Sequence, residues 1–424
     1  MNVKELRAGW LTLAAACIAS AAGACSAGSS DPGAKTESAP PGSSSSGGSS
    51  SAGASASEGG VVADATTPLD ASQLIDAGAP LDAASTPDGD AGPAANAGYD
   101  VSARIAAFNA RLVAVRVAAG QSATSTFAPL SLPTPPTLTT QLTVSNATEM
   151  AAAAAMSNVE VTFTGSGFTA TLNLSGRHDQ RWIFPAGFTL TAPSDGYAIQ
   201  YGNANRIELV GTGGRVVGGT FGAPVDLRVR GMDIRTRTDS SQIYLDTHSM
   251  EPCSRVLIES SYWFARSYAL LYGQCTDFVV GNSEFVSAGA HATSRTTASD
   301  LVLWMASRLV TQGAQQLFRA HAGTNRFAGW NLRLEGSTGI YIGPAGAAGV
   351  NVQDLVLLDN TYYGAGQAIH APYTSSLGAN VTMATVVANR AYTTWTDELT
   401  AGPGWIVSNN SISAPVSAPP WSRQ

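Results

Sequence analysis

From residue 206 onward the sequence repeats one short pattern, in which a polar residue usually opens a stretch of alternating apolar positions. Successive stretches begin 20–29 residues apart. A unit of this length cannot bury its own apolar side chains, so neighbouring units must stack and share a core. The pattern therefore predicts a parallel β-solenoid with insertions confined to its turns. The stretches are Arg206–Leu209, Asp226–Val229, Arg255–Ile258, Asp277–Val280, Asp300–Leu303, Arg326–Gly329, Asp354–Leu357, Asn380–Met383 and Trp405–Ser408.

The alternation predicts which side chains enter the core. We expect the second and fourth residue of each stretch to point inward, and nine turns at about 4.8 Å each to form a rod of roughly 43 Å. The inward residues in second position are Ile207, Leu227, Val256, Phe278, Leu301, Phe327, Leu355, Val381 and Ile406.

The middle turns are apolar on their outward positions as well. There we expect Trp304 and Trp330 to stack on adjacent turns, where they could hold sugar rings. The other interpretation is that this stripe is covered by a helix over 100–118, by the connector 121–145 or by the C-terminal tail. We favour a cover, with Phe108 and Leu112 as its contacts, because a large bare apolar patch promotes aggregation.

Two helices are predicted before the repeats. Asp100 or Ser102 can cap a helix with apolar residues at helical spacing, and Gly120 ends it. A Pro-rich connector, 129–136, follows. Asn146 and Glu149 then form a variant of the capping box before the alanine run 151–155.

The repeats and the helix at 146–155 resemble right-handed parallel β-helix proteins of the pectate-lyase type, over about residues 145–415. The resemblance implies an all-β solenoid of nine or more turns with a short N-terminal helical cap. It implies little about activity, because this fold carries lyases, hydrolases, esterases and non-catalytic surface proteins.

The chemistry known on this fold is only partly represented. Residues 99–424 hold no Lys, which excludes lyases with a Lys base. Hydrolases on this fold use clustered Asp residues, and residues 99–424 contain no adjacent pair of Asp residues. A calcium site with an Arg base has its nearest approach in Arg235, Arg237, Asp239 and Asp246. That motif is too loose to predict a metal, and no cofactor is evident.

Cys253 and Cys275 each stand two residues before the polar opener of their stretch. They should occupy the same place on consecutive turns, within disulfide range. We predict a disulfide, since an exported protein meets an oxidising compartment. The alternative is a pair of buried free thiols.

The polar candidates lie on a second strand of the later repeats. If Ile340, Ile342 and Ile369 point inward, Tyr341 and His370 point outward. Arg319 and His321 share one parity and would join them on a neighbouring turn, with His291 and Arg295 one turn earlier. Such a face could neutralise a uronate carboxylate and move a proton. The candidate catalytic residues are Arg319, His321, Tyr341 and His370, and the candidate substrate-binding residues are Trp304, Trp330, His291 and Arg295. Equally, this row of polar side chains could be an ordinary solvated surface.

The first residues predict export. Lys4 and Arg7 precede an apolar run, 10–22, which is too short to span a bilayer comfortably and has the length of a signal-peptide core. The sequence Ala22-Gly-Ala-Cys25 resembles a bacterial lipoprotein box, in which Cys25 is lipidated. Ala22 and Ala24 also satisfy ordinary signal cleavage, which would give a secreted or periplasmic protein, and lipidation at Cys17 is a further alternative.

Composition divides the chain into five segments. We expect a signal peptide (1–24), a disordered low-complexity linker (25–98), a helix with a Pro-rich connector (99–145), the β-helix domain (146–415) and a C-terminal tail (416–424). Residues 99–424 contain 20 Arg against 12 Asp and 8 Glu, so this part is formally neutral and gives no electrostatic reason to bind nucleic acid.

The function hypothesis is an exported, surface-anchored monomer, at the outer membrane or cell surface, that binds or processes an extracellular polysaccharide. As an enzyme it would be a polysaccharide lyase or a glycoside hydrolase. The competing hypothesis is a non-catalytic structural or adhesion module of the cell surface.

Overall fold

The structure is a computed structural model that describes residues 99–194, 196–237, 247–289, 292–313, 316–321, 323–343, 351–370, 380–393 and 404–423. The expected signal peptide, Cys17, Cys25 and the linker lie outside these residues, as do His291, Asp239 and Asp246. Within the described part, no helix combines the length and apolar character needed to cross a membrane.

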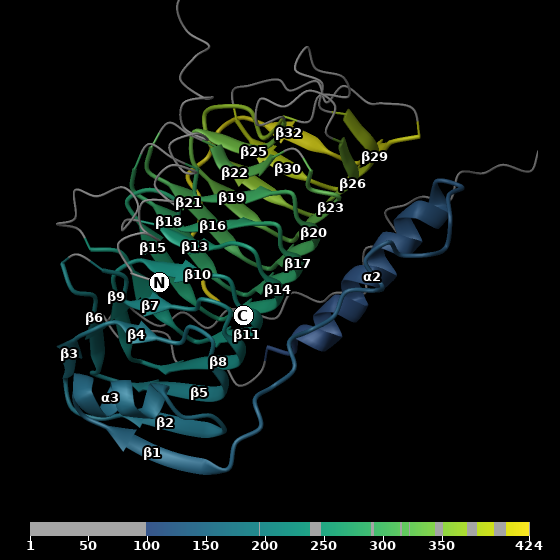
Figure 1. Cartoon of the computed structure of the whole chain (residues 1–424). Helices are drawn as coiled ribbons and strands as arrows, with labels where there is room; N and C mark the ends of the chain where they lie inside the picture. Colours follow the sequence, from purple (N-terminus) through teal and green to yellow (C-terminus); the bar gives the residue numbers. More distant parts are fainter. Residues whose placement is uncertain are drawn as a thin grey trace, which may run out of the picture. The chain divides into compact units, whose positions relative to one another are not determined.

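Three parallel sheets wind along one axis (Figure 1). The chain is a right-handed parallel β-helix. Sheet A consists of β1 Thr140–Val144, β2 Val159–Phe163, β5 His178–Pro185, β8 Asn205–Thr212, β11 Val225–Arg230, β14 Ser254–Glu259, β17 Thr276–Gly281, β20 Asp300–Met305, β23 Arg326–Trp330, β26 Asn351–Leu358, β29 Asn380–Val387 and β31 Ile406–Ser408.

The other two sheets complete each turn. Sheet B consists of β3 Gly167–Thr169, β6 Thr189–Thr191, β9 Arg215–Val217, β12 Asp233–Arg235, β15 Tyr262–Ala265, β18 Glu284–Ser287, β21 Arg308–Thr311, β24 Arg333–Glu335, β27 Thr361–Tyr363, β30 Arg390–Tyr392 and β32 Ser411–Ser413. Sheet C consists of β4 Leu172–Asn173, β7 Ile199–Gln200, β10 Thr220–Gly222, β13 His248–Met250, β16 Leu270–Gly273, β19 Ser294–Thr297, β22 Gln316–His321, β25 Thr338–Gly343 and β28 Ile369–His370.

Both predicted helices are present. Helix α2, Val101–Ala118, begins at Asp100, whose carboxylate accepts a hydrogen bond from the Ala103 N–H. Helix α3, Ala147–Ala154, has Asn146 as its N-cap and covers the N-terminal end of the coil (Figure 1). The coil begins at β1, before the residue 146 at which the sequence places it, because the short strand β1 already pairs with β2.

The polar openers form a column at the corner where each sheet A strand begins. Arg206, Asp226, Arg255 and Asp277 stack in register, as predicted, and adopt left-handed φ values of 50–56°. Their charges alternate, so the Nη2 of Arg206 lies 2.5 Å from Asp179 and the Nε of Arg255 lies 2.6 Å from Asp226. The openers therefore turn the chain and pair it to the next turn.

The predicted register is wrong at Asp300. Leu301, rather than Asp300, occupies the left-handed column, and Val302 pairs with Phe278. Consequently Val302 and Trp304 point into the core, while Leu301 and Leu303 point outward. Both faces of this strand are buried, so alternation of polarity carries no signal there.

Two later turns are also shifted. Val381 is inward as predicted, but it pairs with Val352 instead of Leu355. Ile406 pairs with Thr385 and points outward, against the prediction. Here again apolar residues occupy both the inward and the outward positions of the strands, because an outer layer covers this part of sheet A.

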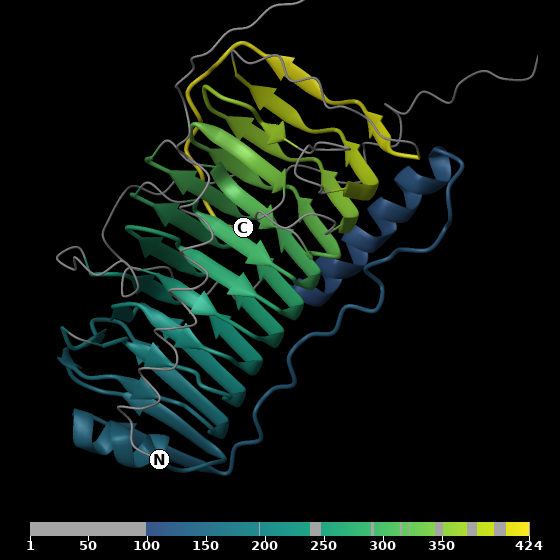
Figure 2. The ribbon, with the colours of Figure 1, turned by 45° about the horizontal axis from the view of Figure 1, so that its top comes forward.

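That outer layer is α2 together with Phe127 of the connector, which confirms the predicted cover (Figure 2). Phe108 and Leu112 are fully buried in it. The C-terminal tail lies elsewhere, since the Arg333 guanidinium of sheet B donates to the carbonyls of Pro419 and Pro420. The outward apolar residues under the layer are Leu257, Val279, Leu301, Leu303, Met305, Ala328, Val356, Leu358, Val387 and Ile406.

The Pro-rich connector runs back along the opener column. The backbone N–H groups of Ser131, Thr134 and Thr137 donate to Asp277, Asp226 and Asp179, respectively. These donors are three residues apart, and the acceptors lie on every second turn. Three residues of an extended Pro-rich chain span about 9.3 Å, and two turns rise about 9.6 Å. The connector thus matches the repeat of the coil without a bulge.

The predicted disulfide is present. Cys253 and Cys275 lie on consecutive turns with Cα atoms 4.4 Å apart and are bonded to each other. Both are buried in the core.

Candidate functional site

The candidate polar residues form one column on the outer face of sheet C. Arg295 pairs with Arg319, Arg319 with Tyr341, and Tyr341 with His370, so they occupy four consecutive turns. The inward neighbours Ile340 and Ile342 are buried, as the sequence predicts. We name this column, Arg295, Arg319, Tyr341 and His370, the sheet C ladder.

The two arginines of the ladder are stacked like charges. Each Nε is buried and has no hydrogen-bond partner in the described part of the chain. The Arg319 guanidinium lies 5.9 Å from the ring centre of Tyr341, and that of Arg295 lies 6.0 Å from Tyr268. Like charges one turn apart repel each other, and buried donors without acceptors cost free energy, so this pair is ready to receive an anion.

An acid stands beside the ladder that the sequence analysis did not identify. Glu251 follows β13 directly, and an added Cβ on Gly273, one turn on, would lie 2.9 Å from its Oε1. The carboxyl group therefore extends over the bare backbone of Gly273. Burial by the neighbouring turns raises the pKa of Glu251, and the positive charge of Arg295 opposes this shift.

The histidine candidates are placed only by their backbone. His321 pairs with Gly343, two positions beyond Arg319 on the same outward parity, and the side chains of His321 and His370 lie outside the described residues. His291 is not described at all. The backbone register places His321 in the same strand as Arg319 and His370 in the strand that pairs with Tyr341.

The two tryptophans do not form an exposed stack. Trp304 is fully buried in the core, where its Nε1–H donates to the Tyr272 hydroxyl at 2.9 Å. Trp330 pairs with Met305 and packs under α2, 5.9 Å from the Phe108 ring centre. The prediction that they bind substrate together is wrong, because the shift at Asp300 places them on opposite sides of sheet A.

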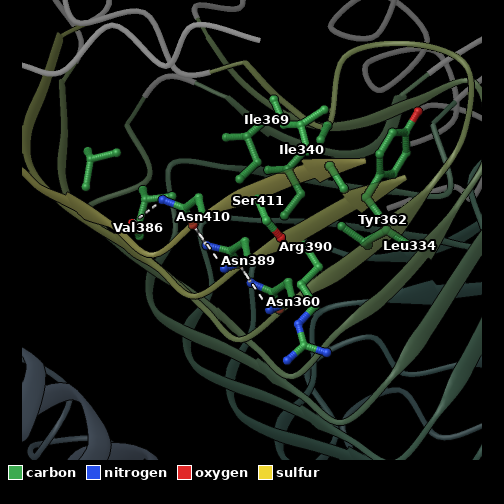
Figure 3. Close-up of a pocket in the computed structure, with 14 residues that line it drawn as sticks. Leu334, Ile340, Asn360, Tyr362, Ile369, Val386, Asn389, Arg390, Asn410 and Ser411 are labelled. Atoms are coloured by element: carbon green, nitrogen blue, oxygen red, sulfur yellow. Dashed lines mark hydrogen bonds between the residues drawn. The ribbon is translucent and has the colours of Figure 1, made fainter. Parts of the chain in front are cut away.

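A cavity of about 250 Å³ lies at the C-terminal end of the coil (Figure 3). Its wall includes Asn360, Asn389 and Asn410, whose side chains bond to one another and to the backbone of neighbouring turns. For example, the Asn360 Nδ2 donates to the Gly329 carbonyl at 2.9 Å. The hydrogen bonds of these amides are used within the coil, and most other side chains that line the cavity are apolar. The cavity therefore offers few polar groups to a ligand.

No group of three His, Cys, Asp or Glu residues that could hold a metal is found in the described part of the chain. Arg235 from the loose calcium motif pairs with Asp233 at 2.7 Å, and Asp233 also pairs with Arg215. Arg237 donates to the Ala192 carbonyl.

No family model and no curated protein matches this sequence. Among solved structures, the chain is similar to a polygalacturonase from Erwinia carotovora ssp. carotovora, at 11% sequence identity and a TM-score of 0.32. The match covers 66% of this chain and 98% of that chain.

Proposed function

We propose that this protein is exported, anchored through Cys25, and binds an acidic extracellular polysaccharide along the sheet C ladder. The observation that carries the proposal is the Arg295–Arg319 pair, whose buried Nε donors have no partner among the described residues. A carboxylate is the natural acceptor, because guanidinium groups bind carboxylates with strong, directional hydrogen bonds.

The spacing of the ladder suits a polymer. Consecutive ladder residues are about 4.8 Å apart, a distance comparable to the length of one pyranose unit in an extended chain. A polysaccharide lying parallel to the rod axis would therefore present one sugar to each turn. The aromatic ring of Tyr341 continues the ladder beyond the arginines, where it can pack against a sugar ring.

A rigid surface module without a ligand is the competing function. Such a spacer has no use for buried arginine donors without acceptors or for an acid whose pKa is raised beside them. A carboxyl group whose pKa is shifted by burial next to a charged partner is typical of binding and catalytic sites. The proposal of binding is favoured on this ground.

The test is binding of the full chain to uronate polymers. The panel is polygalacturonate, alginate and hyaluronate, with methyl-esterified polygalacturonate as the neutral counterpart, measured by calorimetry. We expect Arg295→Gln and Arg319→Gln each to weaken binding of the acidic polymer roughly 10–100-fold, the value of one charge-assisted hydrogen bond. Arg390→Gln removes the same charge from sheet B and should leave binding unchanged.

Three results would overturn the proposal. They are absence of binding to every acidic polymer, equal affinity for the neutral ester, and equal loss in Arg390→Gln and Arg295→Gln.

The same samples test catalysis by the ladder. Unsaturated products indicate a lyase, and new reducing ends indicate a hydrolase. Loss of product in both His321→Ala and His370→Ala, with polymer binding retained, would assign these residues a catalytic role. Unchanged product release would exclude them.

A further inference from the structure

A second constellation lies at the N-terminal end of the coil, far along the chain from the sheet C ladder. The Ser157 Oγ is 3.1 Å from the His178 Nε2, and the His178 Nδ1 is 3.0 Å from the Asp179 Oδ2. Val159 pairs with Gln180, so Ser157 and His178 face each other across one turn. These are the contacts of a serine, a base and an orienting carboxylate.

The partners determine the histidine tautomer. An ionised carboxylate can only accept, so the His178 Nδ1 carries the proton and donates it to Asp179. The Nε2 is then free to accept the Ser157 hydroxyl proton. Asp179 is held ionised, because its hydrogen bonds from Arg206 lower its pKa, and the Thr137 N–H adds to this effect. The Asp179 side chain is 5% exposed and that of His178 is 51% exposed, so the base reaches solvent.

The backbone at Ser157 supplies donors. Ser157 follows α3, and the next residue, Asn158, adopts a left-handed φ of 60°. Neither the Ser157 N–H nor the Asn158 N–H makes a hydrogen bond among the described contacts. Free N–H groups beside a left-handed residue are suited to an oxyanion.

A small pocket adjoins this segment. It measures about 200 Å³, and its lining includes Ala154, Ala155 and Arg177. Ala155 is two residues before Ser157, and Arg177 directly precedes His178. The Arg177 Nε is buried and has no partner in the described structure. The pocket thus combines a short apolar wall with one free cationic donor.

We propose that Ser157, His178 and Asp179 form a hydrolytic site for esters of small acyl groups on an anionic molecule. The Ser157 Oγ adds to the ester carbonyl carbon while its proton passes to the His178 Nε2. The carbon–oxygen bond to the alcohol then breaks, and His178 returns the proton to the leaving oxygen. Water attacks the acyl-serine by the same two transfers, which releases the acid and restores Ser157. Asp179 stabilises the imidazolium in both halves.

The test uses the full chain, a fluorophosphonate probe and p-nitrophenyl acetate. We expect the probe to label Ser157, identified by peptide mass, and Ser157→Ala to lower acetate hydrolysis by roughly 10³-fold or more. His178→Gln should lower both readouts comparably. Ser166→Ala changes an exposed serine in the following loop and should leave both unchanged. p-Nitrophenyl octanoate should be a poorer substrate, since the pocket is small.

The proposal would be overturned if Ser157 stays unlabelled, or if hydrolysis persists in Ser157→Ala at the wild-type rate. Because Ser157→Ala removes only one hydroxyl at the surface of the coil, retained polymer binding and far-UV circular dichroism will show that the fold is intact. Failure of this site leaves the sheet C proposal untouched, since the two tests use different residues and ligands.

Discussion

Replacing Arg116 by Met is expected to lower the free energy of unfolding by about 3–5 kcal/mol. Arg116 lies in α2, and its Nη2 bonds both oxygens of Asp354 in β26, at 2.7 and 2.9 Å. Both side chains are 3% exposed. Its Nε also bonds Thr385 and its Nη1 bonds Thr126, so one guanidinium joins α2, the connector and two turns. Met retains the aliphatic bulk but leaves Asp354 buried without its counter-charge.

Urea denaturation at neutral pH measures this effect, with Arg111→Met as the matched control. Arg111 of α2 also forms an ion pair with an acid, Asp359, which directly follows β26, but the two side chains are 29% and 31% exposed. An exposed pair contributes about 0–1 kcal/mol. The double variant Arg116→Met with Asp354→Leu should recover most of the loss, because it buries no unpaired charge. Equal costs at positions 116 and 111 would contradict the prediction.

The coil itself could be predicted because the polar residues that open the first four stretches adopt a left-handed backbone conformation. Asp226 and Asp277 occupy a left-handed corner that short polar side chains tolerate better than most residues. Their repetition is therefore visible in the sequence. Arg206 and Arg255 occupy the same corner between them, and their charge alternation with the acids strengthens the pattern.

The predicted register is wrong where the polar residue Asp300 does not occupy the left-handed corner itself. At Asp300 the acid stands one residue before the corner and still pairs with Arg326 of the next turn, so its charge role survives while Leu301 takes the turn. Parity could not correct the error, because α2 buries the outward face of the same strands. The misplacement of Trp304 follows from this single residue.

The residues of the candidate sites also divide into those that the sequence predicts and those that it does not. The ladder was predictable from alternation in β25, where Ile340 and Ile342 flank Tyr341 and only one parity is apolar. Glu251 was missed because its carboxyl group lies over Gly273, and a glycine carries no side chain that could reveal this contact in the sequence. Ser157 and His178 are 21 residues apart, about one turn, but the first turns lie before the repeats that the sequence reveals.

Acid should destabilise this protein through His248, well above the pH at which most carboxylates protonate. His248 is fully buried beside Trp263, with its Nε2 donating to the Phe264 carbonyl and its Nδ1 near the Thr220 hydroxyl. Burial lowers its pKa to about 4, and the Phe264 contact opposes this shift.

In the unfolded chain the imidazole has a pKa of about 6.5. Between these two values only the unfolded state binds the proton, so the free energy of unfolding falls as the pH decreases from about 6.5 to about 4. The full loss is about 3 kcal/mol, and the stability is complete above the unfolded value.

The measurement is the free energy of unfolding of wild type and His248→Leu across this pH range. Because carboxylates titrate alike in both proteins, the difference between the two isolates His248. Wild type should exceed the variant most at pH 7, and this margin should shrink by about 3 kcal/mol by pH 4. Met250→Leu alters the neighbouring inward residue of β13 without a titrating group and should follow the wild-type profile. A margin between wild type and His248→Leu that does not change with pH would contradict the prediction, because it would mean that the fully buried imidazole, packed against Trp263, binds protons as readily as in the unfolded chain.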